Sequence, residues 1–180
     1  MLLFAHTGLT AGMAVLLEKS AARSAAGSVL KFDYRLVLVG SVLPDIIDKP
    51  LGLIILGSSL GNSRIFGHTL LLTLLLTTFG IILKRNSGSL GLLTIAGGSF
   101  VHLMLDQMWL QPQTLCWPAL GVPFPPRNAE TWLANVITNG FTDTAVYVPE
   151  MIGAAIVIVV GLRILESGGV KNFLKRGKLP

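Results

Sequence analysis

Charged residues, aromatic residues and cysteines are all scarce in this chain of 180 residues. Only 13% of the residues are charged and 7% are aromatic, whereas 52% are hydrophobic. This balance, with a mean hydropathy of +0.70, excludes an ordinary soluble globular domain and is typical of a polytopic membrane protein. Cys116 is the only cysteine, which excludes an intrachain disulfide and a zinc site built from several thiolates.

Long apolar stretches take the place of the missing charges. A spanning helix needs about 20 mostly apolar residues, or as few as about 17. We therefore expect an all-α, polytopic transmembrane bundle of about five spanning helices, forming a single integral membrane domain over residues 1–180. The N-terminal stretch lacks the positive leading region of a signal peptide, so we interpret it as a retained helix. The predicted spans are Met1–Leu17, Leu36–Leu60, Phe66–Leu83, Leu90–Leu110 and Val148–Leu165.

The second stretch contains two prolines, Pro44 and Pro50, around Asp45 and Asp48. A proline inside a helix removes a backbone donor. Irregular backbone at membrane depth is tolerated only where it is buried in protein or lines a wet cavity. The pattern predicts a broken second helix, and a functional cavity explains it better than a simple kink.

Lysine and arginine cluster between alternate apolar stretches and after the last one, which indicates membrane topology rather than nucleic-acid binding. By the positive-inside rule the protein would lie in the inner (cytoplasmic) membrane, with the N-terminus outside and the C-terminus in the cytoplasm. Arg64 and Arg127 fall on the outer side, and Lys49 is ambiguous. The residues on the cytoplasmic side are Lys19, Arg23, Lys31, Arg35, Lys84, Arg85, Arg163, Lys171, Lys175, Arg176 and Lys178.

A long outer connection, at about residues 111–147, is rich in proline and carries Trp117 and Trp132. It is too apolar for a plain solvent linker. An interfacial lid and a structural cap held by aromatic residues explain it equally well.

All three histidines fall within apolar stretches, and aspartates accompany them. An ionisable residue in lipid costs roughly 2.5–3.5 kcal/mol on insertion scales, so it usually faces the bundle interior and has a function. The topology, which was derived from lysine and arginine alone, places six such residues at one level near the outer leaflet. These residues are His6, Asp45, Asp48, His68, His102 and Asp106.

Imidazole and carboxylate groups are ligands for zinc, manganese or iron. His102 and Asp106 are four residues apart, so both side chains would lie on one face of a helix. The predicted ligands of a divalent metal, most plausibly zinc, are His6, Asp45, His68, His102 and Asp106. Six polar groups exceed the needs of one ion, so either two ions bind or some residues only orient the ligands.

Other residues have predicted roles in a reaction with metal-activated water. Asp48 or Asp106 would act as the general base. Arg64 and Lys49 would bind an anionic substrate, although snorkelling or pairing with Asp48 is the simpler role for a cation here. Glu150 could add a carboxylate to the site or lie at the interface.

The chain resembles the YdjM-type family through an early His6, GSVLPDIIDKP, RIFGHTLLLT and HLMLDQMWLQPQTLCWPALG. The resemblance covers Met1 to about Pro125. Members of this family are described as inner-membrane-associated, LexA-binding hydrolases and as membrane-bound metal-dependent hydrolases, and a relation to zinc-dependent phospholipase C has been suggested. The resemblance implies that the six histidines and aspartates form the metal and catalytic set, with Arg64 matching the family's arginine. Here Ser63 stands where family members often carry a further histidine.

Three hypotheses follow. The first is a metal-dependent hydrolase in the membrane, acting on a lipid or a lipid-linked ester, most plausibly a phosphoester. The second is a transporter or ion-conducting protein that uses the same intramembrane cluster, although the chain has no internal repeat and few helices. The third is a structural protein whose polar groups only hydrogen-bond between helices. The sequence defines no oligomeric state.

Overall fold

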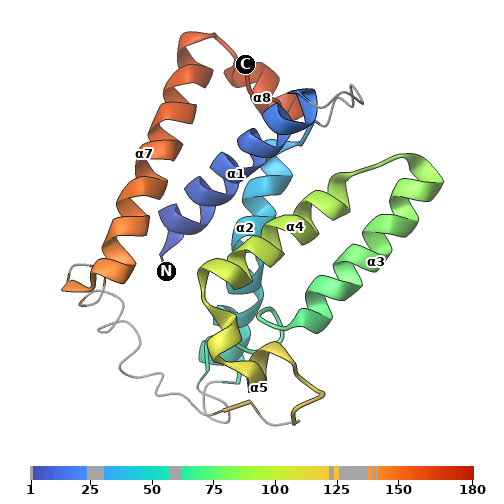
Figure 1. Cartoon of the computed structure of the whole chain (residues 1–180), viewed down its shortest axis with the longest axis vertical. Helices are drawn as coiled ribbons and strands as arrows, with labels where there is room; N and C mark the ends of the chain where they lie inside the picture. Colours follow the sequence, from blue (N-terminus) through green and yellow to red (C-terminus); the bar gives the residue numbers. More distant parts are fainter. Residues whose placement is uncertain are drawn as a thin grey trace.

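The fold is all-α: a computed structural model contains helices and no strand among the residues it describes (Figure 1). It describes residues 2–23, 31–56, 62–121, 124–125, 138, 140 and 142–180. The five long helices correspond to the five apolar stretches of the sequence. In chain order the elements are α1 (Leu3–Arg23), α2 (Tyr34–Lys49), the π-helix η1 (Pro50–Ile55), α3 (Leu70–Ser87), α4 (Gly91–Leu105), the 3₁₀ helix η2 (Met108–Leu110), α5 (Pro112–Leu115), α7 (Thr144–Glu166) and α8 (Val170–Arg176).

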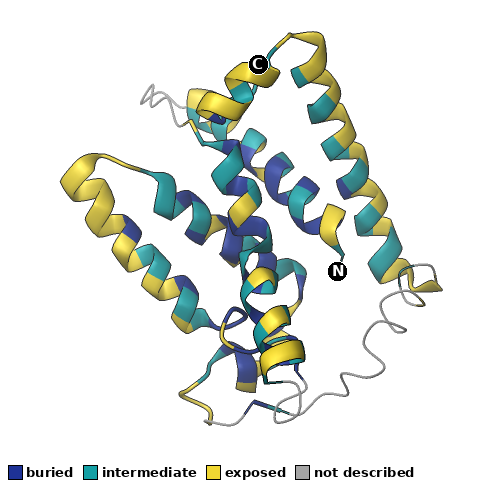
Figure 2. Cartoon of the chain, turned by 180° about the vertical axis from the view of Figure 1, so that it is seen from behind, coloured by how far each residue is buried: buried dark blue, intermediate teal, exposed yellow. Residues whose placement is uncertain are grey.

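The centre of the bundle is formed by α1, α2 and α4, while α3 packs outside α4 and α7 packs outside α1. Figure 2 shows buried residues concentrated on the central helices and mostly exposed residues on α3 and α7. Glycines permit the closest approaches. A Cβ on Gly98 of α4 would lie 2.9 Å from the carbonyl carbon of Gly40 in α2, and one on Gly8 of α1 would lie 2.1 Å from the carbonyl oxygen of Gly153 in α7. The small residues therefore set the helix spacing.

Two of the described helices, α3 and α7, are long and apolar enough to cross a membrane. α4 is apolar but shorter. The expected bundle of about five spanning helices is therefore not confirmed: the described chain has five long helices, but only two of them satisfy the length and apolarity of a span. The polar groups that α1 and α2 bury inside the bundle, such as His6, Thr10 and Ser41, take the place of apolar residues in these two helices.

The second helix is not broken, contrary to prediction. α2 runs through Pro44 without interruption and continues at Pro50 into η1. Pro44 cannot donate to the carbonyl of Gly40, four residues earlier. Ser99 of α4 supplies the missing donor, because its Oγ donates to that carbonyl over 3.2 Å. A π-helical turn accommodates Pro50, as such turns often do near functional sites.

Of the helix boundaries that differ from the predicted spans, two affect site residues. α3 begins at Leu70 rather than Phe66, after Thr69 caps it by accepting a hydrogen bond from the Leu72 amide over 3.2 Å. His68 therefore lies in the loop of residues 62–69 and not in a helix. α4 ends at Leu105, because Gln107 adopts a left-handed conformation with φ of 53°.

The C-terminal segment folds back onto the start of α2. The Tyr34 amide donates to the Gly177 carbonyl over 2.7 Å, Arg35 Nη1 donates to the Leu174 carbonyl over 2.8 Å, and Lys178 Nζ donates to the Phe32 carbonyl over 2.9 Å. The basic residues after α7 and those before α2 consequently lie at one end of the molecule. Arg127 and Trp132 of the predicted outer connection lie outside the described residues.

Candidate metal centre

A buried aspartate, Asp48, organises the loop that carries His68. Asp48 has no exposed surface. Its carboxylate accepts hydrogen bonds from the amides of Ile65 over 2.7 Å, Gly67 over 2.6 Å and His68 over 3.1 Å, and from His68 Nδ1 over 2.7 Å. The loop approaches α2 this closely because residue 67 is glycine: a Cβ there would lie 2.5 Å from the Pro44 carbonyl oxygen. Asp48 thus fixes the proton of His68 on Nδ1 and leaves Nε2 as a lone-pair donor.

His102 on α4 is oriented in the same way by a backbone group. Its Nδ1 lies 2.7 Å from the carbonyl oxygen of Ser41. A carbonyl only accepts hydrogen bonds, so Nδ1 carries the proton and Nε2 carries the lone pair. The Nε2 atoms of His68 and His102 are 3.2 Å apart. Two lone pairs facing one another at this distance repel, and a cation between them removes the repulsion.

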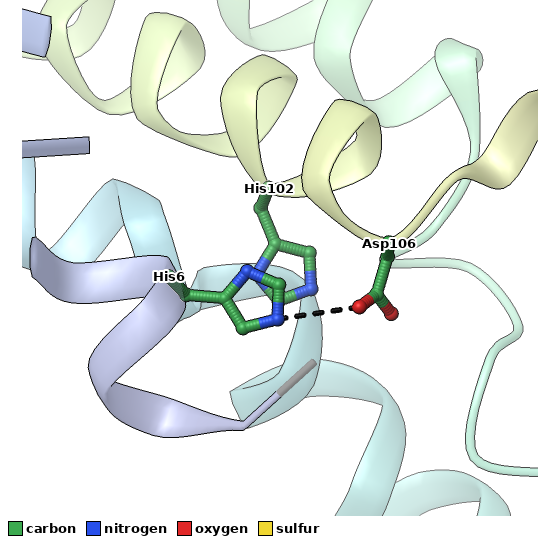
Figure 3. A group of neighbouring side chains, drawn as sticks. All are labelled: His6, His102 and Asp106. Atoms are coloured by element: carbon green, nitrogen blue, oxygen red, sulfur yellow. Dashed lines mark ion pairs between the residues drawn. The ribbon is translucent and has the colours of Figure 1, made fainter. Parts of the chain in front are cut away.

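His6 of α1 completes the group of imidazoles. Its ring stacks on that of His102, with centroids 3.9 Å apart (Figure 3). The side chain is 1% exposed, yet neither ring nitrogen makes a hydrogen bond in the described structure. Nε2 does lie 3.2 Å from Asp106 Oδ1, which is an ion-pair distance without hydrogen-bond geometry. A buried polar group without a hydrogen bond is costly. If His6 bound a metal ion, one of its ring nitrogens would have the ion as its partner.

Asp106, at the end of α4, joins the histidines to Arg64. Its Oδ2 lies 2.6 Å from Arg64 Nη2 and 3.6 Å from His68 Nε2. The Asp106 side chain is 4% exposed, so the carboxylate of this ion pair is buried. The pairing gives Arg64 a fixed position at the edge of the cluster.

Asp45 approaches the cluster from α2. Its Oδ1 lies 3.8 Å from His68 Nε2, and its Oδ2 lies 2.8 Å from Lys49 Nζ. Lys49 thus pairs with Asp45 and not with Asp48, the partner considered from the sequence. The partners of Asp48 are His68 and the backbone amides of the loop. With a side chain 22% exposed, Asp45 is the more accessible carboxylate.

The structure brings all six predicted residues together, and five of them form two overlapping groups with suitable donor atoms. The groups are His6, His102 and Asp106, and Asp45, His68 and His102; within each, the donor atoms lie within 4.8 Å of one another. Two nitrogens bound tetrahedrally to zinc are about 3.3 Å apart when each bond is about 2.0–2.1 Å. The observed separation of 3.2 Å between His68 and His102 matches this value. The donor set therefore fits a divalent ion.

Two residues weighed from the sequence have structural contacts. Glu150 caps the start of α1, where its oxygens accept hydrogen bonds from the amides of Phe4 over 2.8 Å and Ala5 over 2.9 Å. Trp117 packs edge-on against Phe66 of the His68 loop, with centroids 5.2 Å apart, and stacks on Phe124. These contacts favour the structural cap for the described part of the outer connection.

Sequence reasoning missed the backbone groups of the site. The Ser41 carbonyl and the amides of residues 65 and 67 orient the histidines, and no side-chain pattern marks them. The proline at position 44 was the one available signal, because it showed that backbone groups in this part of α2 need partners from elsewhere.

An all-α protein with membrane-length apolar helices and a buried histidine–aspartate cluster belongs to the class of helical membrane proteins with a candidate metal centre. The family described as YdjM inner membrane protein matches residues 1–170, and the chain belongs to this family. No curated protein and no solved structure matches the chain.

Proposed function

We propose that the protein is a membrane-embedded, metal-dependent hydrolase that acts on a lipid or lipid-linked phosphoester. The observation that carries this proposal is the pair of Nε2 atoms of His68 and His102, 3.2 Å apart and each oriented through Nδ1. Metal-binding histidines have this arrangement, with the second nitrogen donating to a carboxylate or a carbonyl.

His102 limits the number of ions. Because its Nδ1 is held by the Ser41 carbonyl, it offers one lone pair, and one lone pair binds one ion. Both candidate groups contain His102, so they describe alternative ligand sets around one central ion. His68 and His102 would provide the imidazoles, Asp106 and Asp45 the carboxylates, and His6 a further donor.

The remaining residues have roles that follow from their contacts. A bound divalent ion supplies Lewis-acid polarisation of a phosphoryl oxygen and lowers the pKa of water. Both oxygens of Asp48 are engaged by the loop, so we assign Asp48 to positioning His68 and leave Asp106 as the candidate base. Arg64, fixed by Asp106, would bind the phosphoryl group, with Lys49 near Asp45 as a second cation.

The membrane placement rests on the family and on the two apolar helices. We propose that α3 and α7 span the inner membrane, and that the basic end formed by α8 and the start of α2 faces the cytoplasm. The N-terminus and the metal centre then lie toward the outer leaflet.

Metal analysis combined with an esterase assay tests the proposal. Purified wild-type protein should carry about one divalent ion per chain and cleave phospholipid phosphoesters, whereas the His68→Ala variant should lose both properties. Cys116→Ser, which changes a thiol outside the cluster, is the control and should keep both. Wild-type protein that remains metal-free when supplied with zinc, manganese or iron would overturn the proposal. Solute uptake into vesicles that His102→Ala abolishes, without ester cleavage, would favour a transporter.

A further inference from the structure

A cavity of about 260 Å³ opens beside the metal centre. It is bounded by the end of α4 and η2, by Arg64, and by the first residues of α7. Asp106 and Arg64 belong both to this cavity and to the cluster described above. A molecule in the cavity would therefore touch the residues next to the candidate ion.

The size of the cavity selects what fits. Sites that enclose whole small molecules measure about 300–1,000 Å³, so this cavity holds a head group and not a complete lipid. Exposed apolar side chains lie next to the cavity: Leu110 lines it and is 67% exposed, and Trp109, adjacent in sequence, is 51% exposed. An acyl chain attached to the head group can stay outside, against these apolar side chains.

The charged residues of the cavity come from different elements. Arg64 belongs to the loop before α3 and Asp106 to the end of α4, whereas Asp143 precedes α7. Arg64 is paired with Asp106, whereas no ion pair joins Asp143 to a cation within the described part of the chain. Asp143 Oδ1 accepts a hydrogen bond from the Ala145 amide over 2.9 Å, which holds the carboxylate at the start of α7.

Two neutral amides complete the polar lining, Gln107 and Gln111. Gln107 has φ of 53°, an uncommon conformation for a residue other than glycine that tends to persist at functional sites. Both side chains can donate to and accept from a head group without adding charge.

We propose that this cavity binds a zwitterionic phosphoester head group, with the phosphate at Arg64 and an ammonium group at Asp143. The Arg64 guanidinium would donate hydrogen bonds to the phosphate, and the Asp143 carboxylate would pair with the ammonium group. Asp143 thereby becomes a specificity residue that distinguishes an amino-alcohol phosphoester from a purely anionic one. This inference rests on the proposed hydrolase function, because the bound head group is taken to belong to the substrate.

Binding and cleavage, measured separately, test this proposal. The probes are short-chain phosphatidylethanolamine and short-chain phosphatidylglycerol, titrated calorimetrically against the metal-loaded full-length protein in detergent. Wild-type protein should bind the ethanolamine lipid up to about five-fold more tightly, the upper limit for a solvent-exposed ion pair. Asp143→Asn should bind the two lipids equally, and asparagine preserves the helix cap. Asp33→Asn, the same change at the cap of α2, should leave the preference intact.

The outcomes separate the head-group site from the hydrolase. Equal binding of the two lipids by wild-type protein, or a preference that survives in Asp143→Asn, would overturn the head-group site whether or not cleavage occurs. A preference that depends on Asp143, without cleavage of either lipid, would support the head-group site and count against the hydrolase.

Discussion

Asp48 and His68 form a fully buried pair, in which His68 Nδ1 donates to Asp48 Oδ2 over 2.7 Å. The same carboxylate accepts hydrogen bonds from the amides of Ile65, Gly67 and His68, so one side chain fixes both the ring and the backbone that carries it. The orientation of His68, a candidate metal ligand, therefore depends on a residue whose own carboxylate is occupied by the loop.

We predict that Asp48→Asn weakens metal binding by about 10- to 100-fold, the usual effect of losing a partner that orients a ligand. Asparagine also places an NH₂ group, which is a donor, where a carboxylate oxygen accepts from the backbone amides of the loop. The loss of this acceptor should lower the free energy of unfolding by about 1–3 kcal/mol. Competition with a metal-binding dye measures the first effect, and chemical denaturation the second. Asp33→Asn, the same change away from the site, should alter neither metal affinity nor cleavage. An Asp48→Asn protein with wild-type metal affinity would refute the positioning role.

We predict that metal stabilises the folded protein through His102. An ion that binds only the folded state at about 100 times its Kd raises the free energy of unfolding by about 2.7 kcal/mol. Thermal unfolding of the purified protein, with a chelator and then with added zinc, should show this increase. His102→Ala should abolish it, while Cys116→Ser should retain it. A zinc-dependent shift of equal size in His102→Ala would show that the ion binds elsewhere.

Two adjacent glycines of α4 provide a matched test of the helix packing. Gly98→Ala should destabilise the protein by about 1–3 kcal/mol, because its Cβ would meet the backbone of Gly40 at 2.9 Å and force α2 and α4 apart. Gly97→Ala meets no atom within 4 Å and should be neutral or stabilising by up to about 1 kcal/mol. Denaturation of both variants under identical conditions gives the comparison. Equal effects would mean that α2 and α4 are not in contact at Gly40.

A pH effect is expected at the start of α2, outside the predicted spans. The guanidinium of Arg35, bonded to Asp33 over 2.6 Å and 3.0 Å, holds the pKa of Asp33 below its usual range. A carboxylate with a lowered pKa in the folded state stabilises the protein above its unfolded pKa of about 3.9, and that stability is lost as the pH falls below this value. Wild-type protein should therefore lose more stability than Asp33→Asn between about pH 6 and pH 3.

Melting temperatures recorded across this range measure the difference. Parallel curves for the two proteins would show that the Asp33–Arg35 pair contributes nothing to folding. The effect should also shrink at high salt, because the pair is partly exposed and is screened.

Several features followed from the sequence alone. The low charge and long apolar stretches predicted an all-α bundle of about five spanning helices, because a chain so apolar must satisfy its backbone within helices. The all-α fold is confirmed, whereas only two of the described helices qualify as spans. The histidines and aspartates could be grouped correctly, since ionisable residues in apolar helices face one another and not lipid. The family motifs added Arg64 to this group.

Boundaries and hydrogen-bond partners could not be obtained in this way. Pro44 predicted a broken helix because the sequence does not show that Ser99, from a distant helix, donates to the carbonyl that proline leaves unpaired. His68 was predicted to lie at a helix start, and only the tertiary fold places its loop against Asp48. Asp143 was not singled out from the sequence, and only the tertiary structure places it in a cavity with Arg64.

The sequence by itself determined which residues are available for a metal centre and that they lie in apolar helices, because composition and periodicity are local properties of the chain. Only the tertiary structure decided which nitrogen of His68 and which nitrogen of His102 faces the cluster. That choice is made by backbone groups and by Asp48, which are brought to the imidazoles from segments far apart in the chain. A pattern of side chains cannot encode it, since every residue carries the same carbonyl and nearly every residue the same amide.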